Sequence, residues 1–328
     1  MLTAGANDKV NPAMFWAMAY KVSDVLMLLA ESSALVRLAE HELSHQELGA
    51  AMGWQEAPLK CMLDLLVRAG VLACDGTRFS VPVGTTSVLP LVAMEAQTRR
   101  WHASSGSLRR MLETGQTIDP LNAIQDEGFH AGYQQAMAAS ARALALHVFR
   151  HAGLPPQARV LDIGGADGAV SEQLARLMPG STFCVVDRPP VQAHFDARIA
   201  GTAQPDRFRF VSDDVTHPGR LLLEAGQSNV VILSNLLHMI APTPGRELLA
   251  KLRAALPPAS RLIIYDQFLA RDRFDVASLM TVDWVNLGTL FSLSEDDMAE
   301  LLAELGYVSV TRRRFPLLPG ALVCAETE

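Results

Sequence analysis

The sequence predicts an α/β fold with a doubly wound, mostly parallel sheet, preceded by a mostly helical domain. Short apolar runs alternate with helical segments from Ala158 onward, an order typical of a parallel sheet covered on both faces. A Gly-rich turn joins the first of these runs to a segment whose apolar residues share one helical face, Ala169–Met178. Residues 12–105 carry mostly helical spacing. With 328 residues, 49% of them apolar, the chain can hold two domains and a sizeable core.

The first segment, residues 1–105, has the outline of a winged helix. Apolar residues at helical spacing run through Lys21–Ala39, and Ser44 with Glu47 three residues later forms a capping-box pattern. The segments that follow are two helices around a turn at Gly53 and a hairpin that turns at Asp75-Gly76, namely Gln46–Met52, Pro58–Ala69 and Gly70–Val81.

A winged helix can bind DNA, or the same shape can serve as a dimerisation module. Binding in a DNA groove requires basic side chains that neutralise phosphates. Within residues 40–81 the acids outnumber the bases, with Glu40, Glu42, Glu47, Glu56, Asp64 and Asp75 against Lys60, Arg68 and Arg78. We therefore expect a dimerisation domain and a homodimer, with no nucleic-acid partner.

The second segment, residues 106–328, is expected to be the catalytic domain, with residues 106–150 as a helical connector. The expected strands are Arg159–Gly164, Phe183–Asp187, Phe208–Ser212, Asn229–Ser234 and Arg261–Tyr265. The expected helices are Ala169–Met178, Pro190–Ala200, Gly219–Ala225, Thr243–Leu256 and Ser294–Leu305. Val308–Phe315 and Ala321–Ala325 then read as two strands with no helix between them, which predicts an antiparallel C-terminal hairpin at the sheet edge.

Composition and charge exclude several classes of protein. The formal net charge is −7, and no basic tail or stripe stands out. The four cysteines lack metal-type spacing, so we expect reduced thiols and no metal. Residues 1–13 lack the layout of a signal peptide. The longest apolar stretch, Val25–Ala30, is too short for a membrane span. These observations predict a cytoplasmic protein with no membrane partner.

Acidic residues follow the ends of the expected parallel strands, where ligands of a doubly wound sheet bind. Asp162 ends the first strand, Asp187 ends the second, and Asp214 follows the third. A carboxylate at the second strand can accept hydrogen bonds from both hydroxyls of a ribose. That geometry suits the ribose of NAD and that of S-adenosylmethionine equally well.

The Gly-rich turn separates these two cofactors. It reads Asp162-x-Gly164-Gly165-x-x-Gly168, whereas the dinucleotide fingerprint is Gly-x-Gly-x-x-Gly. The carboxylates of Asp162 and Asp167 would repel a pyrophosphate, but they suit a cofactor that carries a sulfonium and an ammonium. The closing hairpin also fits a methyltransferase better. The turn therefore favours S-adenosylmethionine and methyl transfer.

These motifs resemble the small-molecule O-methyltransferases, a family that includes caffeic-acid, hydroxyindole and bacterial polyketide-tailoring enzymes. The matching stretches are Val160-Leu-Asp-Ile-Gly-Gly-Ala-Asp-Gly168, Val185-Val-Asp-Arg-Pro-Pro-Val191, Val211-Ser-Asp-Asp-Val215 and Leu237-His238. The resemblance covers nearly the whole chain and implies a Rossmann-like methyltransferase sheet behind a winged-helix dimerisation domain. The third glycine of the family's usual Gly-Gly-Gly run is Ala166 here.

The resemblance implies residues that bind S-adenosylmethionine. The Gly-rich turn would hold the methionine part of the cofactor, Asp187 the ribose, and Asp214 with Val215 the adenine. Ser234, at the end of the fourth strand, joins this set. The expected cofactor residues are Asp162, Gly164, Gly165, Gly168, Asp187, Asp214, Val215 and Ser234.

A hydroxyl acceptor must lose its proton, and a neutral histidine can take it near pH 7. His238 follows the fourth strand at the edge where the acceptor should lie, and in the family a histidine at this position is the general base. The family flanks this base with two acids. Asp266 matches the first of them, whereas the position of the second is Ser292, so one acid is missing.

The acceptor is expected to be a small, aromatic or polyketide-like secondary metabolite. The connector lines the acceptor pocket in the family, and flat acceptors pack between aromatic and methionine side chains. The expected acceptor contacts are Met137, His130, Met280 and Trp284. Two other functions stay open. A cofactor-binding relative could carry out N- or S-methylation, hydroxylation, decarboxylation or pericyclic chemistry, or the chain could be a DNA-binding regulator that senses the cofactor.

Overall fold

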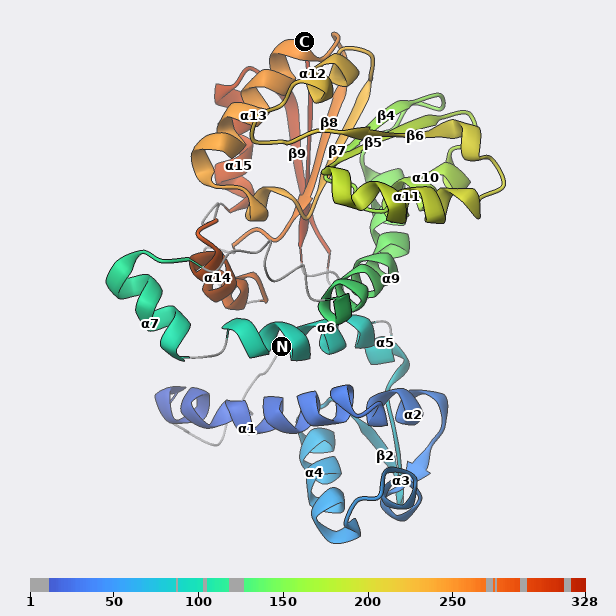
Figure 1. Ribbon diagram of the computed structural model, residues 1–328, viewed down its shortest axis with the longest axis vertical. Helices are drawn as coiled ribbons and strands as arrows, with labels where there is room; N and C mark the ends of the chain where they lie inside the picture. Colours follow the sequence, from blue (N-terminus) through green and yellow to red (C-terminus); the bar gives the residue numbers. More distant parts are fainter. Residues whose placement is uncertain are drawn as a thin grey trace. The chain divides into compact units, whose positions relative to one another are not determined.

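Two compact units make up the chain in this computed structural model (Figure 1). The structure describes residues 12–86, 88–102, 105–117, 127–269, 274, 276–289, 294–315 and 320–328. The first unit comprises residues 1–100 and 128–139, and the second comprises residues 101–127 and 140–328. Part of the expected connector, residues 128–139, thus belongs to the first unit.

The first unit contains a winged helix. Its elements are α1 (Pro12–Glu31), α2 (Ala34–Glu40), β1 (Leu43–Ser44), α3 (His45–Met52), α4 (Glu56–Arg68), β2 (Ala73–Asp75), β3 (Arg78–Ser80), α5 (Val83–Thr86) and α6 (Leu89–His102). The three strands pair in the order β1-β3-β2. This helix–strand–helix–helix–hairpin order confirms the expected outline. Its core gathers Leu29, Leu38, Leu48, Leu63 and Phe79.

Local sequence signals explain where these helices begin and end. The capping box is confirmed, because the Ser44 amide donates to Glu47 Oε2 at 2.7 Å and the Glu47 amide donates to Ser44 Oγ at 3.2 Å. A single helix through Lys21–Ala39 is wrong. Ser33 adopts a left-handed conformation, with φ 65°, between α1 and α2. The Ser32 hydroxyl donates to the Leu28 carbonyl at 2.7 Å, a local bond that competes with helix continuation.

Helix α1 is long and apolar enough to cross a membrane by length and composition. On these two criteria, the expectation that no segment could span a membrane, drawn from Val25–Ala30, is wrong. Its second half nevertheless belongs to the core of the first unit, where Leu29 is fully buried. Asp24 forms an ion pair with Arg99 of α6. Exposed apolar side chains gather in its first half, namely Met14, Phe15, Trp16, Met18 and Tyr20.

The second unit is built on a seven-stranded sheet in the order β6-β5-β4-β7-β8-β10-β9. Its strands are β4 (Arg159–Ile163), β5 (Thr182–Asp187), β6 (Phe208–Ser212), β7 (Val230–Ser234), β8 (Arg261–Asp266), β9 (Val308–Arg314) and β10 (Ala321–Glu326). The first five are parallel, and β10 runs antiparallel to both β8 and β9. The expected C-terminal hairpin is thus confirmed.

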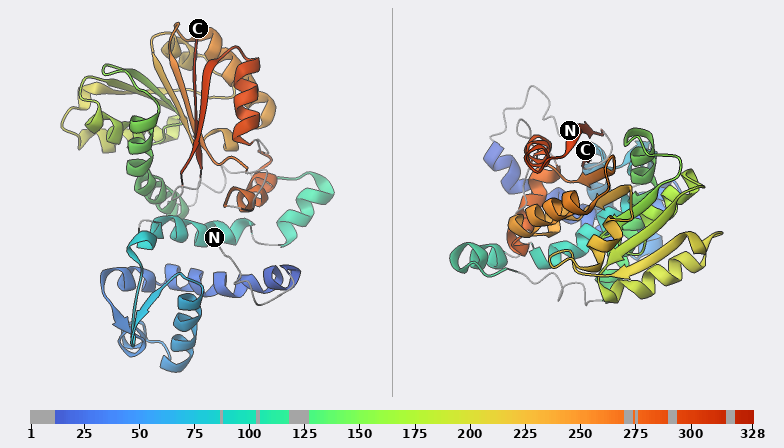
Figure 2. Two further views of the ribbon diagram at one scale, coloured as in Figure 1. Left: turned by 180° about the vertical axis from the view of Figure 1, so that it is seen from behind. Right: turned by 90° about the horizontal axis from the view of Figure 1, so that it is seen from above.

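Helices cover both faces of this sheet, as Figures 1 and 2 show. The helices that follow α6 are α7 (Ser105–Thr114), α9 (Glu127–His151), α10 (Ala169–Leu177), α11 (Gln192–Ala200), α12 (Arg220–Ala225), α13 (Pro242–Ala255), α14 (Val276–Leu287) and α15 (Glu295–Glu304), with short 3-10 turns η1 (Pro189–Val191), η2 (Pro205–Arg207) and η3 (Leu237–Met239). Not all of them pack on the sheet. One core joins α12, α13 and α15 to the sheet, and another joins the end of α9 and α10. Helix α11 packs on the latter face through Phe195.

The strand order reverses at the centre of the parallel part. From β4 the chain moves outward to β5 and β6, and it then returns to β7 on the other side of β4. A crevice at the carboxyl ends of the strands is expected at such a switch point. The five parallel strands therefore bring the residues at their carboxyl ends to one edge of the sheet, which is where the candidate site lies.

Candidate active site

The Gly-rich turn between β4 and α10 follows a path that favours glycine. Gly164 and Gly168 have φ of 68° and 81°, values that strain residues with a side chain. A Cβ atom on Gly164 would lie 2.7 Å from the Leu236 side chain, and one on Gly165 would lie 2.6 Å from the Asp162 carboxyl carbon. Ala166 also has a positive φ, 50°. The departure from the Gly-Gly-Gly pattern therefore places an alanine in a left-handed conformation.

Asp162 is a fully buried carboxylate beneath this turn. The Ser171 hydroxyl donates to its Oδ2 at 2.7 Å, whereas its Oδ1 has no hydrogen-bond partner within the described part of the chain. Burial raises the pKa of Asp162 to about 6. A buried acceptor atom without a partner is costly, and a donor or a cation on a ligand would satisfy it. The turn and its carboxylate thus fit the ammonium-bearing end of the expected cofactor.

Asp187 at the end of β5 is pre-oriented by the backbone. Its two carboxylate oxygens accept hydrogen bonds from the Ala166 amide at 2.9 Å and from the Arg188 amide at 2.7 Å. Each oxygen keeps a further lone pair for a ligand hydroxyl. Burial raises the pKa of Asp187, and the two backbone donors oppose that shift. The carboxylate is therefore held against the Gly-rich turn in an orientation that suits a ribose.

Of the two acids after β6, Asp213 is structural and Asp214 is a candidate ligand. Asp213 Oδ2 accepts from the Gly219 and Leu221 amides at 2.9 and 2.7 Å, at the start of α12. Asp214 Oδ1 accepts from the amide and hydroxyl of Thr216, and these bonds lower the pKa of Asp214. Val215 packs on the sheet core. Ser234 ends β7.

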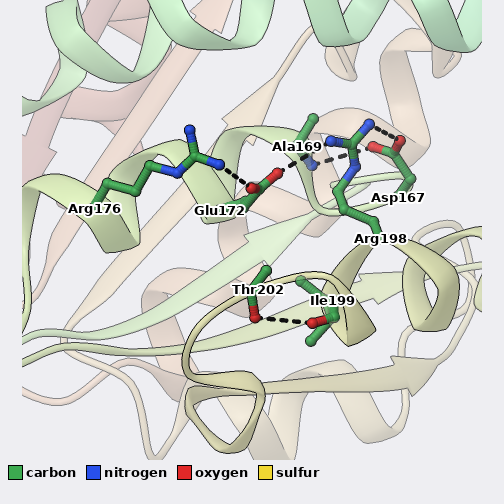
Figure 3. A network of polar contacts seen from close by, with 7 residues as sticks. All are labelled: Asp167, Ala169, Glu172, Arg176, Arg198, Ile199 and Thr202. Atoms are coloured by element: carbon green, nitrogen blue, oxygen red, sulfur yellow. Dashed lines mark hydrogen bonds and ion pairs between the residues drawn. The ribbon is translucent and has the colours of Figure 1, made fainter.

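An ion-pair network holds the far side of the turn (Figure 3). Arg198 of α11 contacts Asp167 Oδ2 at 2.6 Å and Glu172 Oε2 at 3.1 Å. Arg176 also pairs with Glu172. Asp167 Oδ1 in addition accepts from the Ala169 amide at 3.1 Å. The charge of Asp167 is thus partnered by Arg198, so the argument that this acid selects a cationic cofactor is wrong, and Asp162 carries that argument alone.

His238 and Asp266 form a hydrogen-bonded pair at the ends of β7 and β8. Asn235, with φ 50°, turns the chain after β7, and η3 then presents His238. Its Nδ1 lies 2.6 Å from Asp266 Oδ1, and the two side chains are 12% and 4% exposed. The carboxylate also accepts from the Leu237 amide at 2.9 Å and from the Gln267 amide at 2.7 Å. A proton held on Nδ1 leaves Nε2 as an acceptor.

Helix α14 lies beside this histidine. This helix was not predicted from the sequence. It contacts η3, and the centroids of the Trp284 and His238 rings are 6.0 Å apart. Met280, one helical turn before Trp284, is partly buried. Several polar atoms on or just after α14 are buried without a hydrogen-bond partner in the described part of the chain, namely Trp284 Nε1, both amide atoms of Asn286 and Thr289 Oγ1.

Three residues that the sequence analysis expected in this site cannot be placed there. Met137 lies on α9 and is partly buried, but it belongs to the first unit. The side chain of His130 and the whole of Ser292 lie outside the described residues. One acid that the sequence reasoning missed is Asp283 of α14, and burial raises its pKa to about 6. The sequence signal that could have found it is a single charged residue in the mostly apolar segment Val276–Leu287.

Comparisons with known proteins agree with this geometry. A family model described as an O-methyltransferase domain matches residues 116–307, more than half of the chain. Acetylserotonin O-methyltransferase of Rattus norvegicus is 24% identical over 280 residues, which cover 79% of this chain and 63% of that protein. Demethylspheroidene O-methyltransferase of Rhodobacter capsulatus is 29% identical over 196 residues, which cover 58% and 47%. The chain thus spans less than two thirds of these relatives.

The fold is shared by a solved methyltransferase. The SAH-bound form of CalO1, a methyltransferase in calicheamicin biosynthesis, superposes with a TM-score of 0.77 at 20% identity, covering 98% of this chain and 99% of that one. At this identity the likeness shows the fold alone. The extent of the family match, together with the Gly-rich turn and the paired histidine, means that this chain belongs to the O-methyltransferase domain family.

Proposed function

We propose that the chain transfers a methyl group from S-adenosylmethionine to a hydroxyl of a small, aromatic or polyketide-like secondary metabolite. Family membership supports O-methylation, and relatives bear the names of acetylserotonin, demethylspheroidene and tetracenomycin O-methyltransferases. The observation that carries the proposal is the 2.6 Å contact between His238 and Asp266. It lies at the same sheet edge as the Gly-rich turn.

Cofactor binding is assigned to the turn and to the strand ends beside it. Gly164, Gly165 and Gly168 let the backbone approach the methionine part closely, and Asp162 Oδ1 accepts from its ammonium. Asp187 receives the ribose hydroxyls on lone pairs that the backbone leaves open. Solved neighbours with SAM or SAH bound support this assignment. Asp214, Val215 and Ser234 complete the set, with Asp214 and Val215 beside the adenine.

The residues around His238 perform the proton transfer in this proposal. When bound, S-adenosylmethionine supplies an electrophilic methyl group on a sulfonium. Asp266 holds the proton on Nδ1, so Nε2 of His238 takes the proton of the acceptor hydroxyl as it attacks. The imidazolium that forms is stabilised by the carboxylate of Asp266. Alignment of the acceptor oxygen with the methyl group supplies a further share of the acceleration.

The acceptor pocket is assigned to α14. Trp284 lies beside His238, and its buried Nε1 has no hydrogen-bond partner among the described residues. An oxygen on the acceptor next to the reacting hydroxyl would accept from this indole. Met280 shares the α14 face with Trp284 and is the second proposed contact of the acceptor.

The proposal extends to assembly and location. We infer a homodimer, because the first half of α1 exposes a group of large apolar side chains, which is a feature of interaction surfaces. We also infer a cytoplasmic location, since two of the four cysteines, Cys61 and Cys74, are exposed free thiols. The acidic balance of the winged helix supports a role without nucleic acid.

The test is methyl transfer by the purified protein to a panel of phenols and enols, with products identified by mass spectrometry. His238→Ala should keep its affinity for S-adenosylhomocysteine and lose turnover by about a hundredfold or more, because the base is removed while the cofactor site stays intact. His41→Ala replaces an exposed histidine of the first unit and should leave turnover unchanged.

Other outcomes point to the alternative functions. Normal turnover in His238→Ala would exclude this residue as the base. Methylation of amines or thiols only, or a product without a new methyl group, would identify one of the other cofactor-dependent chemistries. Salt-sensitive retardation of DNA in a gel, without turnover of any acceptor, would favour the regulator.

A further inference from the structure

The end of α14 buries polar side chains that have no hydrogen-bond partner in the described part of the chain. Both amide atoms of Asn286, Nε1 of Trp284 and Oγ1 of Thr289 are in this state. Asn286 is 0% exposed, Trp284 is 1% exposed and Thr289 is 8% exposed. A polar group that loses its water without gaining a partner costs free energy. Hydrogen bonds to a bound ligand would remove this cost.

Other buried polar side chains of the second unit have partners that explain them. Ser181 is 1% exposed, and its Oγ accepts from the Ala158 amide at 2.9 Å. Thr327 is 3% exposed, and its hydroxyl donates to the Pro257 carbonyl at 2.6 Å. Asp162, by contrast, has an unpartnered oxygen within the described residues and belongs to the proposed cofactor site. In this respect the end of α14 is similar to a ligand site and not to the structural positions.

This end of α14 lies beside the candidate active site. Helix α14 contacts η3, the turn that presents His238, and the Trp284 ring centroid is 6.0 Å from that of His238. After the helix the chain turns back, because the Thr289 amide donates to the Trp284 carbonyl at 3.0 Å. Trp284 and Asn286 are two residues apart in a helix, so their side chains leave it on different sides. A ligand group at Asn286 therefore lies apart from the reacting hydroxyl at His238.

The amide of Asn286 determines which group it can take. It offers an acceptor oxygen and a donor nitrogen side by side, so its complement is a group with an adjacent donor and acceptor. A carboxamide has this pattern. A ketone or an ether would leave Oδ1 without a donor, and a carboxylate would be repelled by it, with no Lys or Arg on α14 to compensate the charge. The hydroxyl of Thr289 can donate or accept.

We propose that Asn286 and Thr289 form a polar subsite that binds a carboxamide on the acceptor, away from the hydroxyl that receives the methyl group. The inference rests on the proposed function, which places the reacting hydroxyl at His238. Nδ2 of Asn286 donates to the carbonyl oxygen of the acceptor's amide, and Oδ1 accepts from its N–H. Thr289 Oγ1 adds a further hydrogen bond. The subsite selects the acceptor and takes no part in proton transfer.

The test compares meta- and para-hydroxybenzamide with meta- and para-isopropylphenol, in which an apolar group of similar shape replaces the carboxamide. Calorimetry on the protein bound to S-adenosylhomocysteine measures affinity without any need for turnover. The wild type should bind one hydroxybenzamide about ten- to hundredfold more tightly than its isopropyl counterpart. Asn286→Leu, a change of similar shape, should abolish this preference. Thr289→Val should reduce it by about three- to tenfold.

Unfolding of the ligand-free protein in urea separates binding from a structural role. In Asn286→Leu the urea midpoint should not fall, because the change removes a buried amide that lacks a partner. The matched control is Ser181→Ala, which removes a buried hydroxyl that has a partner. Its urea midpoint should fall, while the preference for the hydroxybenzamide should stay.

Equal affinity of the wild type for both members of each pair would overturn the inference, and so would a preference that survives in Asn286→Leu. In either case, methylation of a phenol that is lost in His238→Ala would still support the proposed function. If the wild type methylates no phenol but binds a hydroxybenzamide through Asn286, the proposed function fails and the subsite stands. If Asn286→Leu does not fold, Thr289→Val decides, because an unchanged preference in that variant would also overturn the inference.

Discussion

Aspartates around the Gly-rich turn share one functional group but have different partners. Asp167 is paired with Arg198, and its other oxygen accepts from the backbone at the start of α10. Asp187 accepts from two backbone amides and stays available to a ligand. Asp162 is buried with one oxygen lacking a partner in the described part of the chain. Partners and burial, which no local sequence motif states, decide which of these acids can bind a cofactor.

Asp162 should make the stability of the cofactor-free protein depend on pH. Its pKa is raised from 3.8 to about 6 in the folded chain, so the folded state binds more protons than the unfolded state between these values. The free energy of unfolding should therefore fall as pH rises through this window, by up to about 3 kcal/mol relative to Asp162→Asn. Urea unfolding of both proteins between pH 4 and about pH 7 measures this difference.

The matched control is Asp196→Asn, which neutralises an exposed acid on α11 and should show no comparable change across the window. S-adenosylhomocysteine should reduce the effect in the wild-type protein, because its ammonium favours the charged carboxylate. If the difference in unfolding free energy between the wild type and Asp162→Asn stays constant from pH 4 to pH 7, the burial argument is contradicted.

At the scale of elements, the strands of the sheet were predictable and some helices were not. Each end of strands β4–β8 lies within one residue of expectation, because parallel strands buried on both faces read as short apolar runs. The break between α1 and α2 was missed, since apolar helical spacing continues across Ser32 and Ser33. Helix α14 was missed because its mostly apolar sequence carries no clear period or cap.

The same contrast holds for the candidate site. Parallel order alone predicts that the ends of β7 and β8 are neighbours, so the pairing of His238 with Asp266 could be anticipated. The position of α14 beside His238 could not be anticipated, because it depends on how this helix packs against η3. The partner of Asp167 was equally hidden, since Arg198 lies 31 residues away in the sequence.

Arg198 links α11 to the Gly-rich turn and α10, so its removal should weaken both stability and cofactor binding. Arg198→Ala leaves Asp167 and Glu172, whose side chains are only 12% and 13% exposed, without this cation. Because Arg198 itself is 27% exposed, we expect a loss of about 1–3 kcal/mol in unfolding free energy. Affinity for S-adenosylhomocysteine, measured by calorimetry, should fall as the turn loosens.

Arg176→Ala is the matched control for this prediction (Figure 3). Arg176 pairs with the same Glu172 but is 65% exposed, so its loss should cost less than about 0.5 kcal/mol and leave cofactor affinity unchanged. Equal losses in the two variants would mean that the network contributes general surface charge and does not hold the turn.

At the scale of the whole molecule, the sheet divides the proposed reaction between its two halves. Strands β4, β5 and β6 lead to Asp162, Asp187 and Asp214, which are among the proposed cofactor residues. Strands β7 and β8 carry His238 and Asp266, the proposed proton-transfer pair. The reversal of strand order beside β4 brings the two sets to one edge, so a methyl donor and a hydroxyl acceptor can meet there.

The final prediction concerns the first unit and the assembly of two copies of the chain. Met14 and Met18 lie one turn apart on α1 and are 57% and 48% exposed, a costly arrangement for a protein that stays monomeric. We expect light scattering to give the mass of two chains in solution. The double variant Met14→Glu/Met18→Glu should shift this mass toward one chain, since charges at an apolar contact must be desolvated. Leu223→Glu alters an apolar residue of α12 that is 70% exposed and should leave the dimer intact. A wild-type protein that is monomeric at all concentrations, or a double variant that remains dimeric, would mean that the exposed face of α1 is not the contact between copies.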